Sequence, residues 1–301
     1  MPELPEVETL RRDLSPCLLG RRIVAAEITK PRMLITLVDS GFEAILHQPI
    51  VDLRRRAKML IFDFTNDISM VMHLKLAGQL ILRNDGTTLV SGGHPVPAFD
   101  AEMPHKSTHG RFDLDDGGTL WLTDIRQFAR VTIVSSAFVD EYMASKKLGV
   151  EPLDVGFTLD YFASQLKRRA KLSVKGMLLD QSGIVGLGNI YVDEALYGAQ
   201  IHPSRRSGSL DTIEIKALHA AILESLNYAL DNGVADLPAG KVRPDSDFPR
   251  AHGRHRLPCL RCATIMERIK LEGRSTDFCP VCQPTPPLDQ MAKGENQAIA
   301  R

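Results

Sequence analysis

Residues 257–283, LPCLRCATIMERIKLEGRSTDFCPVCQ, carry two close pairs of cysteines, Cys259 with Cys262 and Cys279 with Cys282. This C-x2-C-x16-C-x2-C spacing lets two tight turns present four thiolates to one tetrahedral zinc ion. A closed set of four sulfur ligands leaves no open coordination position, so the ion is expected to be structural. Two disulfides are the alternative, but nothing in the sequence suggests the secretion that they would require. We therefore expect a finger that one Zn²⁺ folds.

The charge around the finger is locally basic although the whole chain has zero formal net charge. Nine Lys/Arg and four Asp/Glu lie from Lys241 to Arg274, a net of +5. Such a stretch is a candidate phosphate-facing patch, although basic runs also occur on solvated faces. The residues after the finger, 284–301, are polar and Pro-rich, which predicts a disordered tail.

Helical periodicity precedes the finger in FVDEYMASKKL, LDYFASQLKRRAKL, NIYVDEALYGAQ and SLDTIEIKALHAAILESLNYALDNG. Three glycines, Gly183, Gly186 and Gly188, lie just ahead of a helix starting near Asn189. Backbone N–H groups exposed there can hold a phosphate. A dinucleotide site would need a preceding strand, whereas a helix precedes. A helix-turn-helix that holds a nucleic-acid backbone fits better, with Lys175 and Asn189 as candidate ligands. A merely tight interhelical turn remains an alternative.

The first 134 residues carry short β-type runs: RRIVAAEI, MLITLV, KMLIFDF, SMVMHLKL, QLILR, GRFDL, TLWLTD and RVTIV. Their spacing predicts an antiparallel sandwich or barrel. Residues 84–109, rich in Gly, Pro and His, are interpreted as a long loop, either functional or disordered. RRRAKML puts Lys58 where a hairpin tip could carry an ammonium into a cleft, although most such lysines are simply solvated. DIRQFAR puts Arg126 and Phe128 on one face, a pattern that can wedge into a base stack, although Phe128 could equally be core.

The N-terminus, MPELPEVETL, predicts a helix over residues 5–18. Pro5 suits the first helical position, Glu6 and Glu8 suit the positive first turn, and apolar residues recur at helical spacing. Helix chemistry leaves Pro2 and Glu3 unexplained.

Length and composition indicate a globular chain of two or more domains, with 301 residues and 44% hydrophobic content. No apolar run reaches the roughly 18 residues that span a bilayer, and the N-terminus is acidic where a secretory signal is basic. The expected location is the cytoplasm.

Seven motifs in order make the chain resemble the formamidopyrimidine-DNA glycosylase / endonuclease VIII family: PELPEVET, RRRAKML, MHLKLAGQL, DIRQFAR, LGVEPLD, LLDQSGIVGLGNIYVDEAL with IHPSRR, and GRSTDFCPVCQ. The resemblance implies a multidomain α+β fold. Its expected parts are a catalytic β-sandwich with an N-terminal helix (1–134), a helix-two-turn-helix domain (135–240), the zinc finger (241–283) and the tail (284–301). It further implies a bacterial-type monomeric enzyme, bound to the nucleoid through damaged double-stranded DNA.

The resemblance also assigns roles to residues. Pro2, exposed once Met1 is removed, matches the amine that attacks the sugar C1′, and Glu3 matches the acid/base for ring opening. Glu6 matches a supporting carboxylate. Leu76, Arg126 and Phe128 match the residues that fill the gap left by a flipped-out nucleotide. Lys175, Asn189 and Arg274 match phosphate contacts. Lys58 and Arg274 are grouped with Pro2 and Glu3 as catalytic.

The chemistry of an N-terminal proline supports the first assignment independently. An α-amino group has a pKa near ~8, so on the order of a tenth is neutral and nucleophilic at pH 7. A secondary amine condenses with C1′ to give a cationic iminium, an electron sink that permits successive loss of the 3′- and 5′-phosphates. Glu3 can move protons at the same centre.

Several departures from the family pattern bear on substrate choice. Leu76 stands where methionine is usual in the family. Ile125, Gln127 and Ala129 likewise replace the residues that are common at their positions in the family. Residues 233–249 diverge where purine-lesion enzymes carry a glycine-rich loop. The leading hypothesis is a bifunctional glycosylase and lyase for oxidised purines such as 8-oxoguanine and formamidopyrimidines, acting by β,δ-elimination. The alternatives are an endonuclease VIII-like enzyme for oxidised pyrimidines or abasic sites, and a non-catalytic DNA-binding zinc protein.

Overall fold

The computed structural model describes residues 2–232 and 247–292. The chain divides into two compact units between Lys147 and Leu148, and each unit is described separately. Most of the divergent segment, residues 233–246, lies outside the described residues. Within the described part of the chain, no helix is long and apolar enough to cross a membrane.

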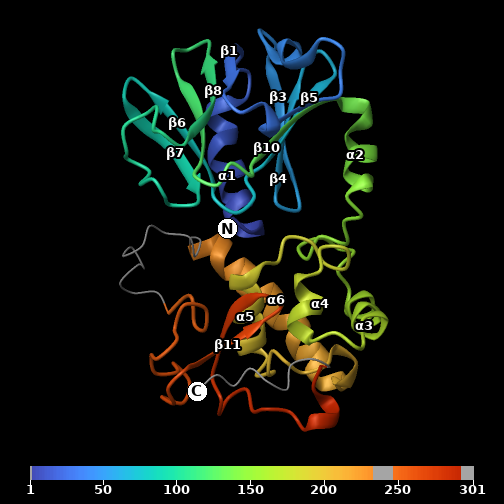
Figure 1. The fold of residues 1–301 in the computed structure, drawn as a ribbon. Helices are drawn as coiled ribbons and strands as arrows, with labels where there is room; N and C mark the ends of the chain where they lie inside the picture. The colour runs from blue at the N-terminus through green and yellow to red at the C-terminus, as the bar shows by residue number, and fades with distance from the viewer. Residues whose placement is uncertain (1, 233–246, 293–301) are drawn as a thin grey trace. The chain divides into compact units, whose positions relative to one another are not determined.

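The first unit is a sandwich of two five-stranded sheets with a helix at its N-terminus (Figure 1). Its helices are α1 (Leu4–Leu18) and α2 (Val139–Ser145), and its strands are β1 (Ile23–Ile28), β2 (Leu34–Thr36), β3 (Ile50–Arg56), β4 (Met59–Phe64), β5 (Ile68–His73), β6 (Gly78–Asn84), β7 (Thr87–Gly93), β8 (Thr108–Leu114), β9 (Thr119–Asp124) and β10 (Arg130–Ser135). The strand orders are β1-β8-β9-β6-β7 and β2-β10-β5-β4-β3. The strand pairs are antiparallel except β2 with β10, which is parallel.

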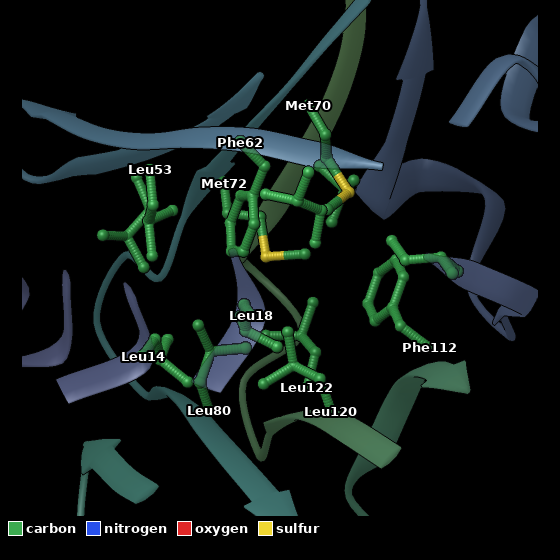
Figure 2. Close-up of a cluster of buried hydrophobic side chains, with 14 of the residues drawn as sticks. Leu14, Leu18, Leu53, Phe62, Met70, Met72, Leu80, Phe112, Leu120 and Leu122 are labelled. Carbon is green, nitrogen blue, oxygen red and sulfur yellow. The ribbon is translucent and has the colours of Figure 1, made fainter. Parts of the chain in front are cut away.

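Helix α1 packs its apolar stripe into the core of the sandwich. Leu14 and Leu18 are fully buried, and Figure 2 shows them among side chains from both sheets, including Phe62 of β4 and Leu80 of β6. Each buried leucine stabilises the fold by roughly 1.5–3 kcal/mol. The predicted N-terminal helix is therefore confirmed, and it begins one residue earlier, at Leu4.

The prediction of a loop across residues 84–109 was wrong for its first third. β7 (Thr87–Gly93) pairs with β6 there, and its glycines hid the strand pattern. Gly92 has a packing reason, because a Cβ at this position would lie 2.7 Å from Leu10 Cγ of α1. The remaining loop is fixed by buried Gln79, whose Nε2 donates to the carbonyls of His94 and Pro97 at 3.0 and 2.8 Å.

The second unit contains helices α3 (Leu159–Arg168), α4 (Val174–Leu179), α5 (Asn189–Gly198) and α6 (Thr212–Asn232), with the hairpin β11 (Glu267–Leu271) and β12 (Arg274–Phe278). A core that includes Phe162 and Tyr191 joins the helices. Of the predicted disordered tail, residues 284–292 are described, and they differ from that prediction in containing a short 3₁₀ helix, Leu288–Gln290. Backbone hydrogen bonds from Arg206 to Gln290 and from Ala292 to Ser204 hold this part, and residues 293–301 lie outside the described chain.

Candidate active site and zinc centre

The N-terminal residues are held by a cap on α1. Glu3 is the N-cap residue and is 1% exposed, and its amide donates to Glu6 Oε2 at 2.8 Å. Glu6 at the third helical position thus satisfies a backbone donor that would otherwise be unpaired. Pro2, also buried, is bonded directly to this fixed residue. The Glu6 carboxylate therefore fixes the backbone beside Pro2.

Lys58 lies in the two-residue turn between β3 and β4, where Ala57 adopts a left-handed φ of +52°. Arg55 donates from Nη1 to the Ala57 carbonyl at 2.9 Å and from Nε to Glu8 Oε2 at 3.1 Å. Glu8 belongs to α1. Burial opposes ionisation of Glu8, but hydrogen bonds and charge from Arg11 and other arginines keep its pKa below the ordinary value. This buried network ties the turn carrying Lys58 to the helix that carries Pro2.

The loop from Ile125 to Ala129 is built around the carboxylate of Asp124, which is 0% exposed. Its Oδ1 accepts from the amide of Arg126 at 2.9 Å, and its Oδ2 accepts from the amides of Phe128 and Ala129 at 2.8 and 2.7 Å. Arg126 is exposed and its Cζ lies 5.1 Å from the Phe128 ring centroid, while Phe128 is 42% exposed. Phe128 is therefore a surface residue, which removes the core alternative.

Strand register gathers three turns at one end of the sandwich. Strand ends beside these turns pair with one another, as Met59 with His73, His73 with Arg130, and Gly78 with Asp124. The turns between β3 and β4, β5 and β6, and β9 and β10 carry Lys58, half-buried Leu76, and Arg126 with Phe128. Residues predicted from separate motifs thus lie on turns at the same end of the first unit.

In the second unit, the predicted phosphate ligands gather around the start of α5. Asn189, its first residue, donates from Nδ2 to the carbonyl of Ser275 at 2.8 Å, next to exposed Arg274 at the start of β12. Lys175, another predicted phosphate ligand, is buried in an ion pair. It is 0% exposed, and its Nζ lies 2.6 Å from Asp193 Oδ1.

Burial lowers the pKa of Lys175, although the Asp193 carboxylate opposes this shift, and the Arg274 guanidinium lowers the pKa further. Two of the predicted phosphate-holding amides also donate within the protein, Gly186 to Gln181 Oε1 and Gly183 to the Asp180 carbonyl. The glycine turn is thus internally bonded at these positions rather than open to a phosphate.

The four finger cysteines form a compact cluster whose sulfur atoms all lie within 4.8 Å of one another. Cys262 and Cys279 have sulfurs 3.5 Å apart, and those of Cys259 and Cys282 are 3.9 Å apart. Sulfurs bound at ~2.3 Å around a tetrahedral zinc lie about 3.8 Å apart, whereas a disulfide bond is about 2.05 Å. The spacing fits one structural Zn²⁺ and not two disulfides.

Three carboxylates that organise these sites were not found from the sequence. Asp124 had a local signal, because an aspartate often bonds backbone amides just after it in a turn. Asp193 and Glu194 had no local sequence signal, because the residues that they bind are remote in the chain. Glu194 accepts from the amides of residues 250, 251 and 252 at 2.7–2.8 Å, so it fixes the entry into the finger on α5.

Three family models match successive parts of the chain. They describe a formamidopyrimidine-DNA glycosylase N-terminal domain over residues 1–131, an H2TH domain of the same enzyme over residues 148–237, and a zinc finger found in FPG and IleRS over residues 256–285.

Curated relatives and solved structures cover nearly the whole chain. The formamidopyrimidine-DNA glycosylases of Streptococcus pneumoniae and Streptococcus mutans are each 36% identical, over 94% of this chain and 99% of theirs. The Lactococcus lactis enzyme bound to DNA containing an oxidised pyrimidine has a TM-score of 0.80 and 34% identity, over 94% of this chain and 100% of that chain. Its complex with DNA containing N7-benzyl-Fapy-dG gives the same values.

Proposed function

The chain belongs to the formamidopyrimidine-DNA glycosylase family, and on this premise we propose that it is a bifunctional DNA glycosylase and lyase that excises oxidised purines from double-stranded DNA. Pro2 is the nucleophile, Glu3 the acid/base and Glu6 the residue that fixes them. The observation that carries the proposal is the capped Pro2–Glu3 terminus, tied through Glu8 and Arg55 to the turn of Lys58.

In the proposed reaction, the neutral Pro2 nitrogen forms a bond to the sugar C1′ while the bond to the damaged base breaks. The nitrogen then loses its proton, and the base takes up a proton as it leaves. Glu3 protonates the ring oxygen O4′, and ring opening leaves an iminium between the nitrogen and C1′. Loss of a C2′ proton expels the 3′-phosphate. A further elimination expels the 5′-phosphate, and water then hydrolyses the iminium to release the amine.

The other predicted residues hold the DNA in this proposal. Leu76, Arg126 and Phe128 fill the space of the extruded nucleotide, which keeps the stack open while the base is outside it. Asn189, Arg274 and Lys175 hold phosphates near the lesion. One Zn²⁺ on the four cysteines maintains the hairpin that presents Arg274, and the enzyme acts as a monomer.

A second specificity, for oxidised pyrimidines, is favoured by one observation. The Lactococcus lactis relative has been crystallised with DNA containing an oxidised pyrimidine. The two specificities differ in which base enters the pocket and share the chemistry at Pro2.

Incision of a panel of duplexes tests the proposal. The panel carries 8-oxoguanine, a formamidopyrimidine, an oxidised pyrimidine, an abasic site, or no lesion. We expect cleavage at both purine lesions and at the abasic site, with phosphates left on both ends of the gap. Much faster cleavage at the pyrimidine lesion would establish the second specificity. Absence of cleavage at every lesion, by zinc-loaded protein whose mass shows loss of Met1, would leave only a DNA-binding role.

A further inference from the structure

One finger cysteine has a hydrogen-bond partner from outside the finger. The Tyr197 hydroxyl, near the C-terminal end of α5, lies 3.3 Å from Cys259 Sγ, and Tyr197 is 3% exposed. A zinc-bound cysteine is a thiolate and has no proton to donate. The hydroxyl must therefore be the donor when the ion is bound.

The Tyr197 ring is held in place by Arg261, which lies between the first two cysteines. The Arg261 Cζ lies 4.7 Å from the ring centroid, and Nη1 donates to the Tyr197 carbonyl at 3.2 Å. The Arg261 amide also donates to Cys259 Sγ at 3.4 Å. Cys259 thus accepts hydrogen bonds both from the finger backbone and from a helix. Because contact with Arg261 already holds the Tyr197 ring, little side-chain freedom is lost when its hydroxyl bonds to the sulfur.

Helix α5 consequently contacts the zinc module at both of its ends. Asn189 at its start donates to the carbonyl of Ser275 in β12. Tyr197, eight residues later, reaches the metal ligand itself. The second contact bears on the ion directly, because a donor to a thiolate stabilises its negative charge and orients its lone pairs.

We propose that Tyr197 is a positioning residue of the zinc site, whose hydroxyl bond to Cys259 slows release of the ion. Loss of such partners of metal ligands typically changes metal affinity by 10- to 100-fold. The proposal concerns retention of the metal, and its test uses no DNA, so its failure would not bear on the proposed enzymatic activity.

The test is the rate of zinc transfer from the loaded protein to a coloured chelator, compared between wild type and Tyr197→Phe. This substitution keeps the ring and its contact with Arg261 and removes only the hydroxyl. We expect about tenfold faster zinc release by analogy with other ligand partners. A rate within about twofold of wild type would overturn the proposal. The matched control is Tyr228→Phe, whose ring also lies against an arginine, with the Arg250 Cζ 5.6 Å from its centroid, and it should release zinc like wild type.

Cobalt loading separates a bond to sulfur from a general loosening of the fold. Removal of a donor raises the energy of the sulfur lone pairs, so the sulfur-to-cobalt charge-transfer band of Tyr197→Phe should move to longer wavelength. Faster metal release with an unmoved band would indicate only a packing role and would overturn the proposal. If Tyr197→Phe does not fold, Arg261→Gln is the second variant, because it frees the Tyr197 ring but keeps the backbone N–H that donates to Cys259 Sγ. It should show faster metal release and the same band shift, both smaller than in Tyr197→Phe. Absence of both changes would also overturn the proposal.

Discussion

Replacement of Asp124 tests how the exposed wedge of Arg126 and Phe128 is held. The buried carboxylate accepts three backbone hydrogen bonds, one on Oδ1 and two on Oδ2. A bond to a charged group contributes at least about 1.5 kcal/mol, so loss of all three in Asp124→Ala should lower the free energy of unfolding by about 4.5 kcal/mol. In Asp124→Asn, the side-chain carbonyl oxygen can still accept two of the three hydrogen bonds, so the free energy of unfolding should fall by only about 1.5 kcal/mol.

The loop should respond more than the rest of the unit, because Gln127 has a left-handed φ of +57° that these bonds help to maintain. Urea unfolding measures the free-energy change. Fluorescence of 2-aminopurine placed opposite an abasic site measures the proposed entry of Arg126 and Phe128 into the stack. We expect a graded loss, with Asn intermediate between wild type and Ala. Equal stability of the Asn and Ala variants, or a wild-type fluorescence response from Asp124→Ala, would refute the reasoning.

Three further predictions concern pH, charge and metal. Burial lowers the pKa of His202 to about 4, and its Nδ1 accepts from the Ser204 amide at 3.2 Å. Because the unfolded chain binds this proton near pH 6.5 and the native state does not, stability should fall by about 2 kcal/mol from pH 7 to pH 5. His202→Gln should flatten that dependence in urea titrations, and an unchanged slope would contradict the assignment. Lys175→Met leaves the buried Asp193 charge without its ammonium and should cost about 3 kcal/mol. Because Lys175 is proposed to hold a phosphate, the salt slope of DNA binding should also fall by about 1, and an unchanged slope would exclude that contact. Removal of zinc should weaken DNA binding while the β-sandwich stays folded, measured by anisotropy and circular dichroism, and equal affinity of the metal-free protein would count against a role of the finger in binding.

Local patterns in the sequence were sufficient for much of the fold. Helix α1 and most strands follow periodicity that a few adjacent residues display, and the cysteine spacing alone predicts the zinc site. β7 was missed because Gly92 does not fit a strand pattern. A glycine is needed there because Leu10, which belongs to helix α1, lies too close for a Cβ. A glycine in a strand reads locally as a loop signal, and only tertiary packing reverses that interpretation.

The residues proposed for the chemistry were named from the sequence, but most of the side chains that support them were not. Pro2 and Glu3 stood out because helix formation left them unexplained. Lys175 was predicted only as a phosphate ligand, and its ion pair was missed because its partner Asp193 lies 18 residues away on another helix. Charge pairing of this kind is decided by which helices meet, and a short sequence window does not contain that information.

The central claim is that the Pro2 amine bonds to the damaged nucleotide, and borohydride trapping tests it most directly. The substrate is a duplex with one 8-oxoguanine opposite cytosine, and the protein is shown by mass to lack Met1. Wild type should form a covalent adduct whose proteolytic fragments map to Pro2, whereas Pro2→Gly should trap through a primary amine with altered yield and Glu3→Gln should trap poorly. The absence of any adduct with wild type, or an adduct that maps to a lysine such as Lys58, would contradict the account.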